Sequence, residues 1–203
     1  LTIVWARRFA AYKRADLITR DVKMFQSLIR DSDRPVQILW AGKPYPFDYG
    51  AIEMFNHLIR FTSDLPNVAV LVGYELELSR ALKLGSDIWL NNPIVTREAS
   101  GTSGMTAAMN ASINLSTYGW VCEYAKDGVN SFIVPPAALD LSPQDRDRHD
   151  LEGLYHALRE QILPLYYDRP ADWWAMAKKS MDDVLPFFGS DRMAAEYYEN
   201  IYA

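Results

Sequence analysis

The chain has 203 residues, 49% of them hydrophobic and 23% charged, which is the ordinary balance of a globular domain large enough to bury one core. Its formal net charge of −5 argues against nucleic acid or a membrane surface as the main partner, and no apolar run approaches the roughly 20 residues of a membrane span. The single cysteine, Cys122, excludes an internal disulfide and has no neighbour at zinc-ligand spacing. We therefore expect a soluble, cytoplasmic protein without a metal, in which a local cluster of cations holds any bound anion.

Strands and helices alternate along the first 150 residues. The apolar run Leu1–Ala6 is typical of a strand buried on both faces, and residues 11–30 carry the apolar spacing of a helix. Strands are then expected at 36–40, 68–72, 87–90, 113–115 and 132–134, and helices at 51–63, 75–84 and 103–109. This alternation predicts an α/β fold, a Rossmann-like doubly wound parallel sheet. Because a core strand begins at residue one, we also expect a longer parent chain.

The remainder of the chain, residues 151–203, predicts a helical C-terminal extension that packs on the Rossmann-like domain of residues 1–150. Helices are expected at 151–163, 171–185 and 192–202, separated by Pro170 and by 186–189. The charged run 145–150 predicts a solvated loop or the start of a helix. The many aromatic residues of the tail lie at helical spacing, which favours core or interdomain packing over a sugar-stacking platform.

Four cations surround the end of the first expected strand. Arg7 and Arg8 follow it directly, and Lys13 and Arg14 come soon after. Ligands of open α/β sheets bind at this edge, and a helix beginning there adds a positive dipole, so we expect a phosphate site. Scattered surface cations are the alternative, which accounts for Arg14 well but less well for Arg7 and Arg8 at the mouth of the sheet.

A glycine-rich segment, Glu98–Gly104, lies between an expected strand and an expected helix. Its two glycines, hydroxyls and backbone N–H groups suit an anion, and the Glu98 carboxylate suits the hydroxyls of a sugar. The same pattern also begins ordinary helices in this fold class, so it is not specific by itself.

In order along nearly the whole chain, several motifs resemble the C-terminal domain of bacterial α-glucan phosphorylases. The motifs are Arg8 with Tyr12-Lys13-Arg14, Gly42-Lys43, Tyr74, Asn91-Asn92-Pro93, Glu98–Met105, Trp173–Lys178 and Phe187–Tyr202. The resemblance implies one half of a GT-B enzyme, in which two Rossmann-like domains face a cleft and glucose is transferred from an α-1,4-glucan to phosphate with retention of configuration. It also implies pyridoxal phosphate in this domain, whose phosphate relays a proton to the substrate phosphate.

Carried over by position, the resemblance assigns roles to three sets of residues. The catalytic phosphate contacts would come from Arg8 and Lys13. Glucose hydroxyls would be bound by Glu98, Ala99, Ser100 and Gly101. The cofactor phosphate would be held by Arg7, Lys13, Tyr74, Thr102 and Ser103.

Two departures fall in the cofactor part of the pattern. Thr106 stands where the family has its Schiff-base lysine, and because a threonine hydroxyl cannot form an imine, covalent attachment of pyridoxal phosphate there is excluded. Tyr118-Gly119-Trp120 stands where the family has an acidic residue and glycine, which affects contacts to the cofactor ring. Any retention of the cofactor at this position would rest on phosphate contacts.

Three functions remain open on the sequence. The first is an α-glucan phosphorylase-like glucosyltransferase, the second a GT-B transferase with a nucleotide-sugar donor such as UDP-glucose or ADP-glucose, and the third a non-catalytic glucan-binding domain. Because a GT-B cleft needs both walls, we expect an N-terminal domain of the parent chain as partner and little activity from this domain alone. Without that partner, an apolar patch should be exposed or used to form a homodimer.

Overall fold

The computed structural model describes residues 1–73 and 75–202. Six strands form one parallel sheet in the order β3-β2-β1-β4-β5-β6. The strands are β1 (Thr2–Ala6), β2 (Gln37–Gly42), β3 (Val68–Val72), β4 (Ile88–Asn91), β5 (Ile113–Thr117) and β6 (Phe132–Val134). This order confirms the Rossmann-like doubly wound fold, and it puts the point where the winding reverses between β1 and β4.

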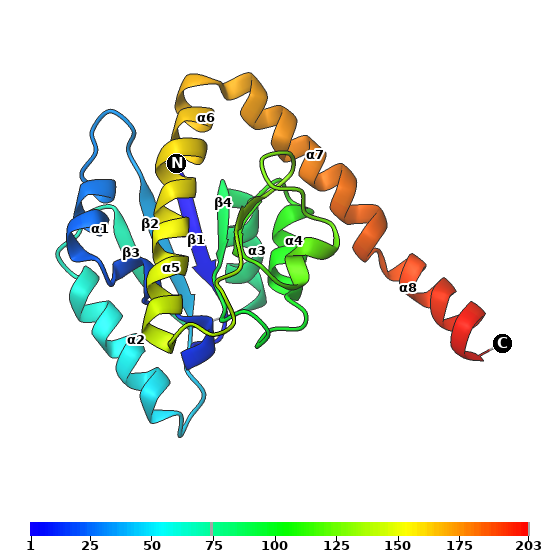
Figure 1. The fold of residues 1–203 in the computed structure, drawn as a ribbon, viewed down its shortest axis with the longest axis horizontal. Helices are drawn as coiled ribbons and strands as arrows, with labels where there is room; N and C mark the ends of the chain where they lie inside the picture. Colours follow the sequence, from blue (N-terminus) through cyan, green and yellow to red (C-terminus); the bar gives the residue numbers. More distant parts are fainter. Residues whose placement is uncertain (74, 203) are drawn as a thin grey trace.

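Helices cover both faces of the sheet (Figure 1). In chain order the helices are α1 (Val22–Ile29), α2 (Tyr49–Thr62), α3 (Leu76–Gly85), α4 (Thr102–Ala108), α5 (Pro143–His156), α6 (Leu163–Asp168), α7 (Pro170–Phe188) and α8 (Ser190–Tyr197). Short 3₁₀ turns span Ala11–Lys13, Leu17–Thr19 and Trp120–Glu123, and π-helical turns span Ala157–Ile162 and Tyr198–Tyr202.

Alternating residues of β1 face two hydrophobic cores on opposite sides of the sheet. Ile3 and Trp5 of β1 point to the larger core, which they share with α1, α2 and α5. Val4 and Ala6 point to the smaller one, which they share with Leu82 of α3 and Ala107 of α4. Both sets are buried, because a parallel strand covered on two faces must be apolar on both.

The long helix expected at 11–30 is wrong in its first half. Arg14 adopts a left-handed backbone (φ 49°), and side chains from elsewhere use two carbonyls that a helix would need. The Asn92 amide donates to the Arg14 carbonyl at 2.9 Å, and the Trp40 indole donates to the Ala15 carbonyl at 2.9 Å. A new helix, α1, begins only where the Asp21 carboxylate caps the Met24 N–H. The positive helix end predicted just after β1 is therefore not present.

The charged run 145–150 is the start of a helix, one of the two predicted alternatives, and not a solvated loop. It lies within α5, which begins at Pro143 rather than at 151 because the Ser142 hydroxyl accepts from the Asp145 N–H at 3.1 Å. Asp150 is fully buried. The predicted start of a helix is confirmed and the alternative of a solvated loop is wrong; Asp150 is buried because it pairs with Arg14.

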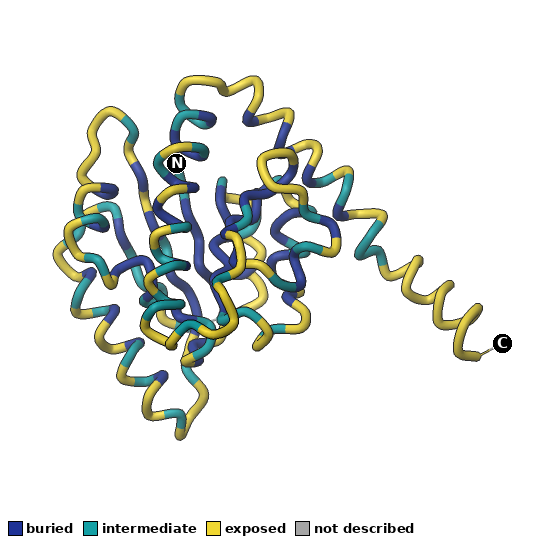
Figure 2. The backbone as a smooth tube through the Cα atoms, in the orientation of Figure 1, coloured by how far each residue is buried: buried dark blue, intermediate teal, exposed yellow. Residues whose placement is uncertain are grey.

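The C-terminal helices leave the body of the domain. α7 runs along the edge of the molecule, and α8 projects beyond it (Figure 1), with every described residue from 190 to 202 exposed (Figure 2). The expected packing of the tail aromatic residues holds for only some of them. Trp173 is buried against Tyr166, whereas Trp174, Tyr198 and Tyr202 are exposed. Large hydrophobic residues of the projecting segment, Met193, Tyr197, Ile201 and the two tyrosines above, are exposed. In the described part of the chain, no helix combines the length and apolarity that crossing a bilayer requires.

Candidate anion and sugar site

The candidate site lies at the carboxyl ends of β1 and β4, where the winding of the sheet reverses. Arg7 follows β1 directly, and Asn91 is the last residue of β4. Because the two strands are neighbours in the sheet, the guanidinium Nη2 of Arg7 donates to the Asn91 side-chain oxygen. This is the position at which open α/β sheets bind ligands.

Two of the predicted cations meet on one carboxylate. Arg7 Nη1 donates to both oxygens of Glu98 at 3.2 Å, and Lys13 Nζ donates to Glu98 Oε2 at 3.0 Å. Ser103 Oγ lies 3.5 Å from Arg7 Nη2. The Arg7, Lys13 and Glu98 side chains are only 4%, 12% and 7% exposed. We call Arg7, Lys13, Asn91, Glu98 and Ser103 the Glu98 cluster.

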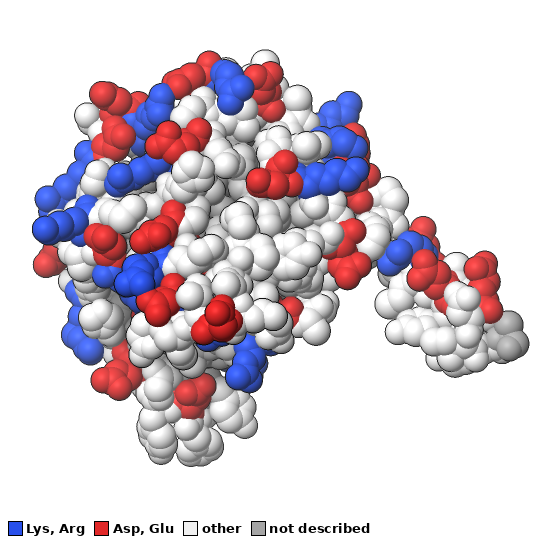
Figure 3. Space-filling model, viewed as in Figure 1, with Lys and Arg blue, Asp and Glu red and all other residues white. Residues whose placement is uncertain are grey.

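The Glu98 cluster carries two positive charges and one negative charge in a place largely shielded from water. Charge interactions are stronger there than on the surface, and the residual positive charge favours an additional anion. No broad basic surface is needed for this: on the face shown in Figure 3, Lys and Arg are interspersed with Asp and Glu. The cluster thus has the local character expected of an anion site in an acidic protein.

Arg8 lies apart from the Glu98 cluster. Its side chain is exposed and lines a separate pocket of about 250 Å³ with Lys43, Pro44, Tyr45 and Pro46. Alternation along the chain explains the separation, because Arg7 turns inward where Arg8 turns outward. The structure therefore brings Arg7, Lys13, Glu98 and Ser103 together, and it places Arg8 elsewhere.

The glycines of the 98–104 segment make room for an indole ring. A Cβ added to Gly101 would lie 2.4 Å from Trp120 Nε1, and one added to Gly104 would lie 2.7 Å from the Trp120 ring. Trp120 is buried beneath the segment. Sequence reasoning missed this role, because the contact is between residues on different elements; Ala99, Ser100 and Thr102 of the same segment are exposed.

Thr106 is held by its own helix. Its hydroxyl donates to the carbonyls of Thr102 and Ser103 at 3.0 and 3.1 Å. The position therefore does not fit covalent pyridoxal phosphate, whereas the cations of the Glu98 cluster fit a phosphate group. Tyr74, the other residue predicted to contact the cofactor, lies outside the described residues.

Arg14 fixes the loop that leads from β4 to Glu98. The sequence pattern was compatible with an exposed surface position for Arg14, but its side chain is 1% exposed. Its Nε donates to the Asn92 carbonyl at 3.1 Å, and its Nη2 to the Pro93 carbonyl at 2.9 Å. The guanidinium also pairs with Asp147 and Asp150 of α5, each at 2.7 Å. Arg14 thus joins β1, β4 and α5 at the edge that carries the site.

Asp147 belongs to the same ionic network. Burial would raise the pKa of its carboxyl, but hydrogen bonds from Arg14 and Arg20 outweigh burial and hold the pKa below its ordinary value. The carboxylate therefore stays ionised wherever the fold is intact and the pH is not strongly acidic.

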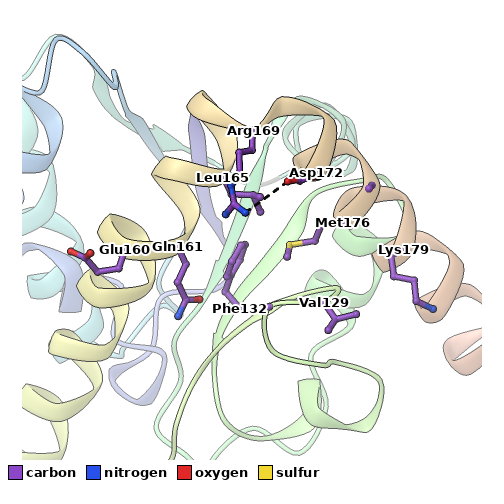
Figure 4. A pocket seen from close by; sticks show the side chains of 11 residues that line it. Val129, Phe132, Glu160, Gln161, Leu165, Arg169, Asp172, Met176 and Lys179 are labelled. Atoms are coloured by element: carbon purple, nitrogen blue, oxygen red, sulfur yellow. Dashed lines mark ion pairs between the residues drawn. The ribbon is translucent and has the colours of Figure 1, made fainter.

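A larger hollow lies away from the Glu98 cluster. A pocket of about 620 Å³ beside the first residues of β6 is bounded by α7 and by the π-helical turn after α5 (Figure 4). Arg169 and Asp172 form an ion pair of 3.8 Å on its rim. None of the predicted site residues lines it.

No protein-family model matches the chain. It is 41% identical over 205 residues to an uncharacterized protein of Methanocaldococcus jannaschii, 36% identical over 208 residues to the maltodextrin phosphorylase of Thermococcus litoralis, and 36% identical over 212 residues to the glycogen phosphorylase of Aquifex aeolicus. Each match covers all of this chain but only 37%, 25% and 30% of the respective relative. Over its whole length the chain is therefore a homologue of one part of the glycogen and maltodextrin phosphorylases, which confirms its resemblance to a phosphorylase C-terminal domain.

Proposed function

We propose that this chain is the C-terminal half of a retaining α-glucan phosphorylase-like glucosyltransferase, which acts on an α-1,4-glucan with phosphate. The observation that carries the proposal is the convergence of Arg7 and Lys13 on Glu98 beside the 98–104 segment. Similarity to phosphorylases over the full length of the chain supports the same assignment.

Within this proposal the Glu98 cluster has two tasks. Lys13 and Arg7 bind a phosphate group. Glu98 accepts hydrogen bonds from glucose hydroxyls, and Ala99, Ser100 and Gly101 form further hydrogen bonds with these hydroxyls. Arg8, in its own pocket with Lys43, supplies a further phosphate contact once the cleft is complete. Pyridoxal phosphate, when bound, supplies a phosphate that acts as an acid and base toward the substrate; here Thr102 and Ser103, with Arg7 and Lys13, would hold it without a covalent bond.

The proposal also concerns the parent protein. Residues 1–150 form the phosphate- and sugar-binding domain, and residues 151–203 form an extension that packs on it and on an N-terminal GT-B domain. The other wall of the cleft excludes water and aligns glucan and phosphate, so the isolated domain should bind ligands with little turnover.

Titration of the chain separates the three candidate functions. Calorimetry with inorganic phosphate, pyridoxal phosphate, UDP-glucose and a maltooligosaccharide should show phosphate binding that Lys13→Met weakens at least roughly tenfold, by about 1.4 kcal/mol. Lys178→Met, on an exposed face of α7, is the matched control and should bind as the unaltered chain does. Binding of UDP-glucose in place of phosphate would support a nucleotide-sugar transferase, and binding of glucan alone would support a non-catalytic domain.

A further inference from the structure

A pocket beside α1 combines two arginines from distant parts of the chain. Its volume is about 270 Å³, near the lower end of small-molecule sites. It is lined by Ser27 and Leu28 of α1, Asp31 and Arg34 of the loop that leads into β2, Arg159 of the π-helical turn after α5, and Leu163 of α6. Because that loop leads into β2, the pocket lies near the amino ends of the strands, whereas the Glu98 cluster lies at their carboxyl ends.

The first arginine, Arg159, pairs with no carboxylate within the described part of the chain. Its guanidinium lies over the Tyr155 ring, with Cζ 5.7 Å from the ring centroid, and its Nη2 donates to the Met24 carbonyl at 3.4 Å. That hydrogen bond is long, and a guanidinium has five N–H donors. These contacts hold the half-buried side chain against α1 and leave its charge and most of its donors available to an anion.

The second arginine, Arg34, has a partner that an anion can replace. Its Nη2 lies 2.5 Å from Asp168 Oδ2, but the two side chains are 35% and 52% exposed. Ion pairs between exposed side chains are weak, and a guanidinium forms strong bidentate hydrogen bonds with phosphate. Exchange of Asp168 for a phosphate group therefore costs little.

Asp31 is the one carboxylate that lines this pocket among the described residues. Its Oδ1 accepts from the N–H groups of Asp33 and Arg34 at 2.9 and 3.1 Å, and these hydrogen bonds offset part of its charge. Two guanidinium groups against one carboxylate leave the lining with an excess of positive charge. The Ser27 hydroxyl adds a neutral donor.

The backbone that carries Arg159 is a second, independent observation. Ala157–Ile162 is a π-helical turn between α5 and α6. Such turns are rare, and they occur frequently at functional sites. This turn supplies one of the two guanidinium groups of the pocket.

We propose that Arg34 and Arg159, with the Ser27 hydroxyl, bind the phosphate group of a small monoester, or free phosphate, at a second anion site of this domain. The inference goes beyond the proposed function, which places its phosphate groups at the Glu98 cluster and at Arg8. Arg34 is 35% exposed and Arg7 only 4%, so water screens the second site more strongly. Its affinity should therefore be lower than that of the Glu98 cluster.

A nuclear magnetic resonance titration tests the inference at each site separately. The chain is titrated with inorganic phosphate, glycerol phosphate and glycerol, and the backbone amide signals of residues 27–34 and 159–163 are compared with those of 98–104. We expect the first two groups of signals to shift with both phosphates and not with glycerol. Tighter binding of glycerol phosphate would identify a monoester as the ligand, and equal or weaker binding would identify free phosphate. Phosphate-induced shifts confined to 98–104 would overturn the proposal.

Variants of the two arginines test their contacts. Arg159→Gln and, independently, Arg34→Gln should each weaken binding at this site at least roughly tenfold, whereas Arg159→Lys, which keeps the charge, should retain part of the affinity. Arg60→Gln, at an exposed position of α2, is the matched control and should bind as the unaltered chain does. Unchanged affinity in both glutamine variants would refute the assignment.

The two phosphate sites are separated by Lys13→Met. This variant should suppress the shifts of residues 98–104 and leave those of 27–34 and 159–163 in place. Loss of all these shifts in Lys13→Met would mean that only one site exists. Absence of binding at the arginine pocket, with the response of 98–104 intact, would remove the second site and leave the proposed function standing.

Discussion

Arg14 and Asp150 form a fully buried ion pair, with Nη2 and Oδ2 2.7 Å apart, between residues that are 136 positions apart in the chain. The pair attaches α5 to the loops that follow β1 and β4. It therefore couples the helical extension of the chain to the edge of the sheet where the Glu98 cluster lies.

Removing either partner of this pair should strongly destabilise the domain. Arg14→Ala leaves Asp150 buried without its cation, which costs about 3–5 kcal/mol in the free energy of unfolding, measured by urea denaturation. Arg148→Ala, which breaks the exposed pair with Asp145, should cost only about 0–1 kcal/mol. Similar losses in the two variants would show that the buried pair contributes no more than a surface pair.

Acid should weaken the same network. The pKa of Asp147 is held below its unfolded value of 3.8, so its contribution to stability is complete above pH 3.8 and is lost as the pH falls below that value. Asp147→Asn should flatten the acid side of the stability curve, measured as urea midpoints between about pH 6 and about pH 2. Asp182→Asn, on an exposed face of α7, should leave the slope unchanged; a slope that Asp147→Asn does not alter would argue against the assignment.

The packing of Trp120 under the 98–104 segment predicts a cost for adding one methyl group. Gly104→Ala should lower the free energy of unfolding by about 1–3 kcal/mol, because the new Cβ would lie 2.7 Å from the indole ring. Gly85→Ala, with no atom within 4 Å of the added Cβ, should change it by less than about 1 kcal/mol. The cost of Gly104→Ala should shrink in a Trp120→Leu background, and an undiminished cost there would exclude the ring as its cause.

Glu98 neutralises part of the positive charge that we assign to phosphate binding. Glu98→Gln should therefore strengthen binding of inorganic phosphate, by roughly tenfold, while weakening binding of a maltooligosaccharide, because an amide replaces a hydroxyl-accepting carboxylate. Calorimetric titration of both ligands measures the two effects. Parallel weakening of both would mean that Glu98 organises the site without competing with the anion.

The projecting helix should contribute little to the stability of the domain. Ending the chain after Gly189 removes residues that are exposed throughout the described range 190–202, together with the stacking of Arg192 on Phe187 at 4.6 Å. The loss should stay near 1 kcal/mol in thermal or urea unfolding. A loss of several kcal/mol would indicate that α8 packs against the body in solution or against a second copy.

Periodicity predicted most of the fold correctly, because buried parallel strands are continuously apolar and their helices are amphipathic. All six strands lie within two residues of their predicted bounds. The segment after β1 was mispredicted because its apolar spacing is helical, whereas its carbonyls accept hydrogen bonds from Trp40 of β2 and from Asn92, which follows β4. Local propensity does not include such partners.

The site shows the same division between local and distant information. The position of Arg7 after a strand and the Glu98–Gly104 motif predicted a meeting of cations with this loop, and the structure brings Arg7, Lys13 and Glu98 together. The sequence could not decide which of Arg7 and Arg8 turns inward, since both follow the same strand. One feature of the sequence could have indicated that Asn91 belongs to the site, namely its position at the end of β4.

The sequence by itself determined the parallel sheet, the cation-rich edge and the absence of an amine at position 106, because each depends on residue type and on spacing along the chain. Only the tertiary structure decided that the buried Arg14 side chain joins the loop after β4 to α5, and that the glycines of the 98–104 segment accommodate Trp120. Those relationships join elements remote in sequence, and they arise from the order of the strands and from the packing of helices against them.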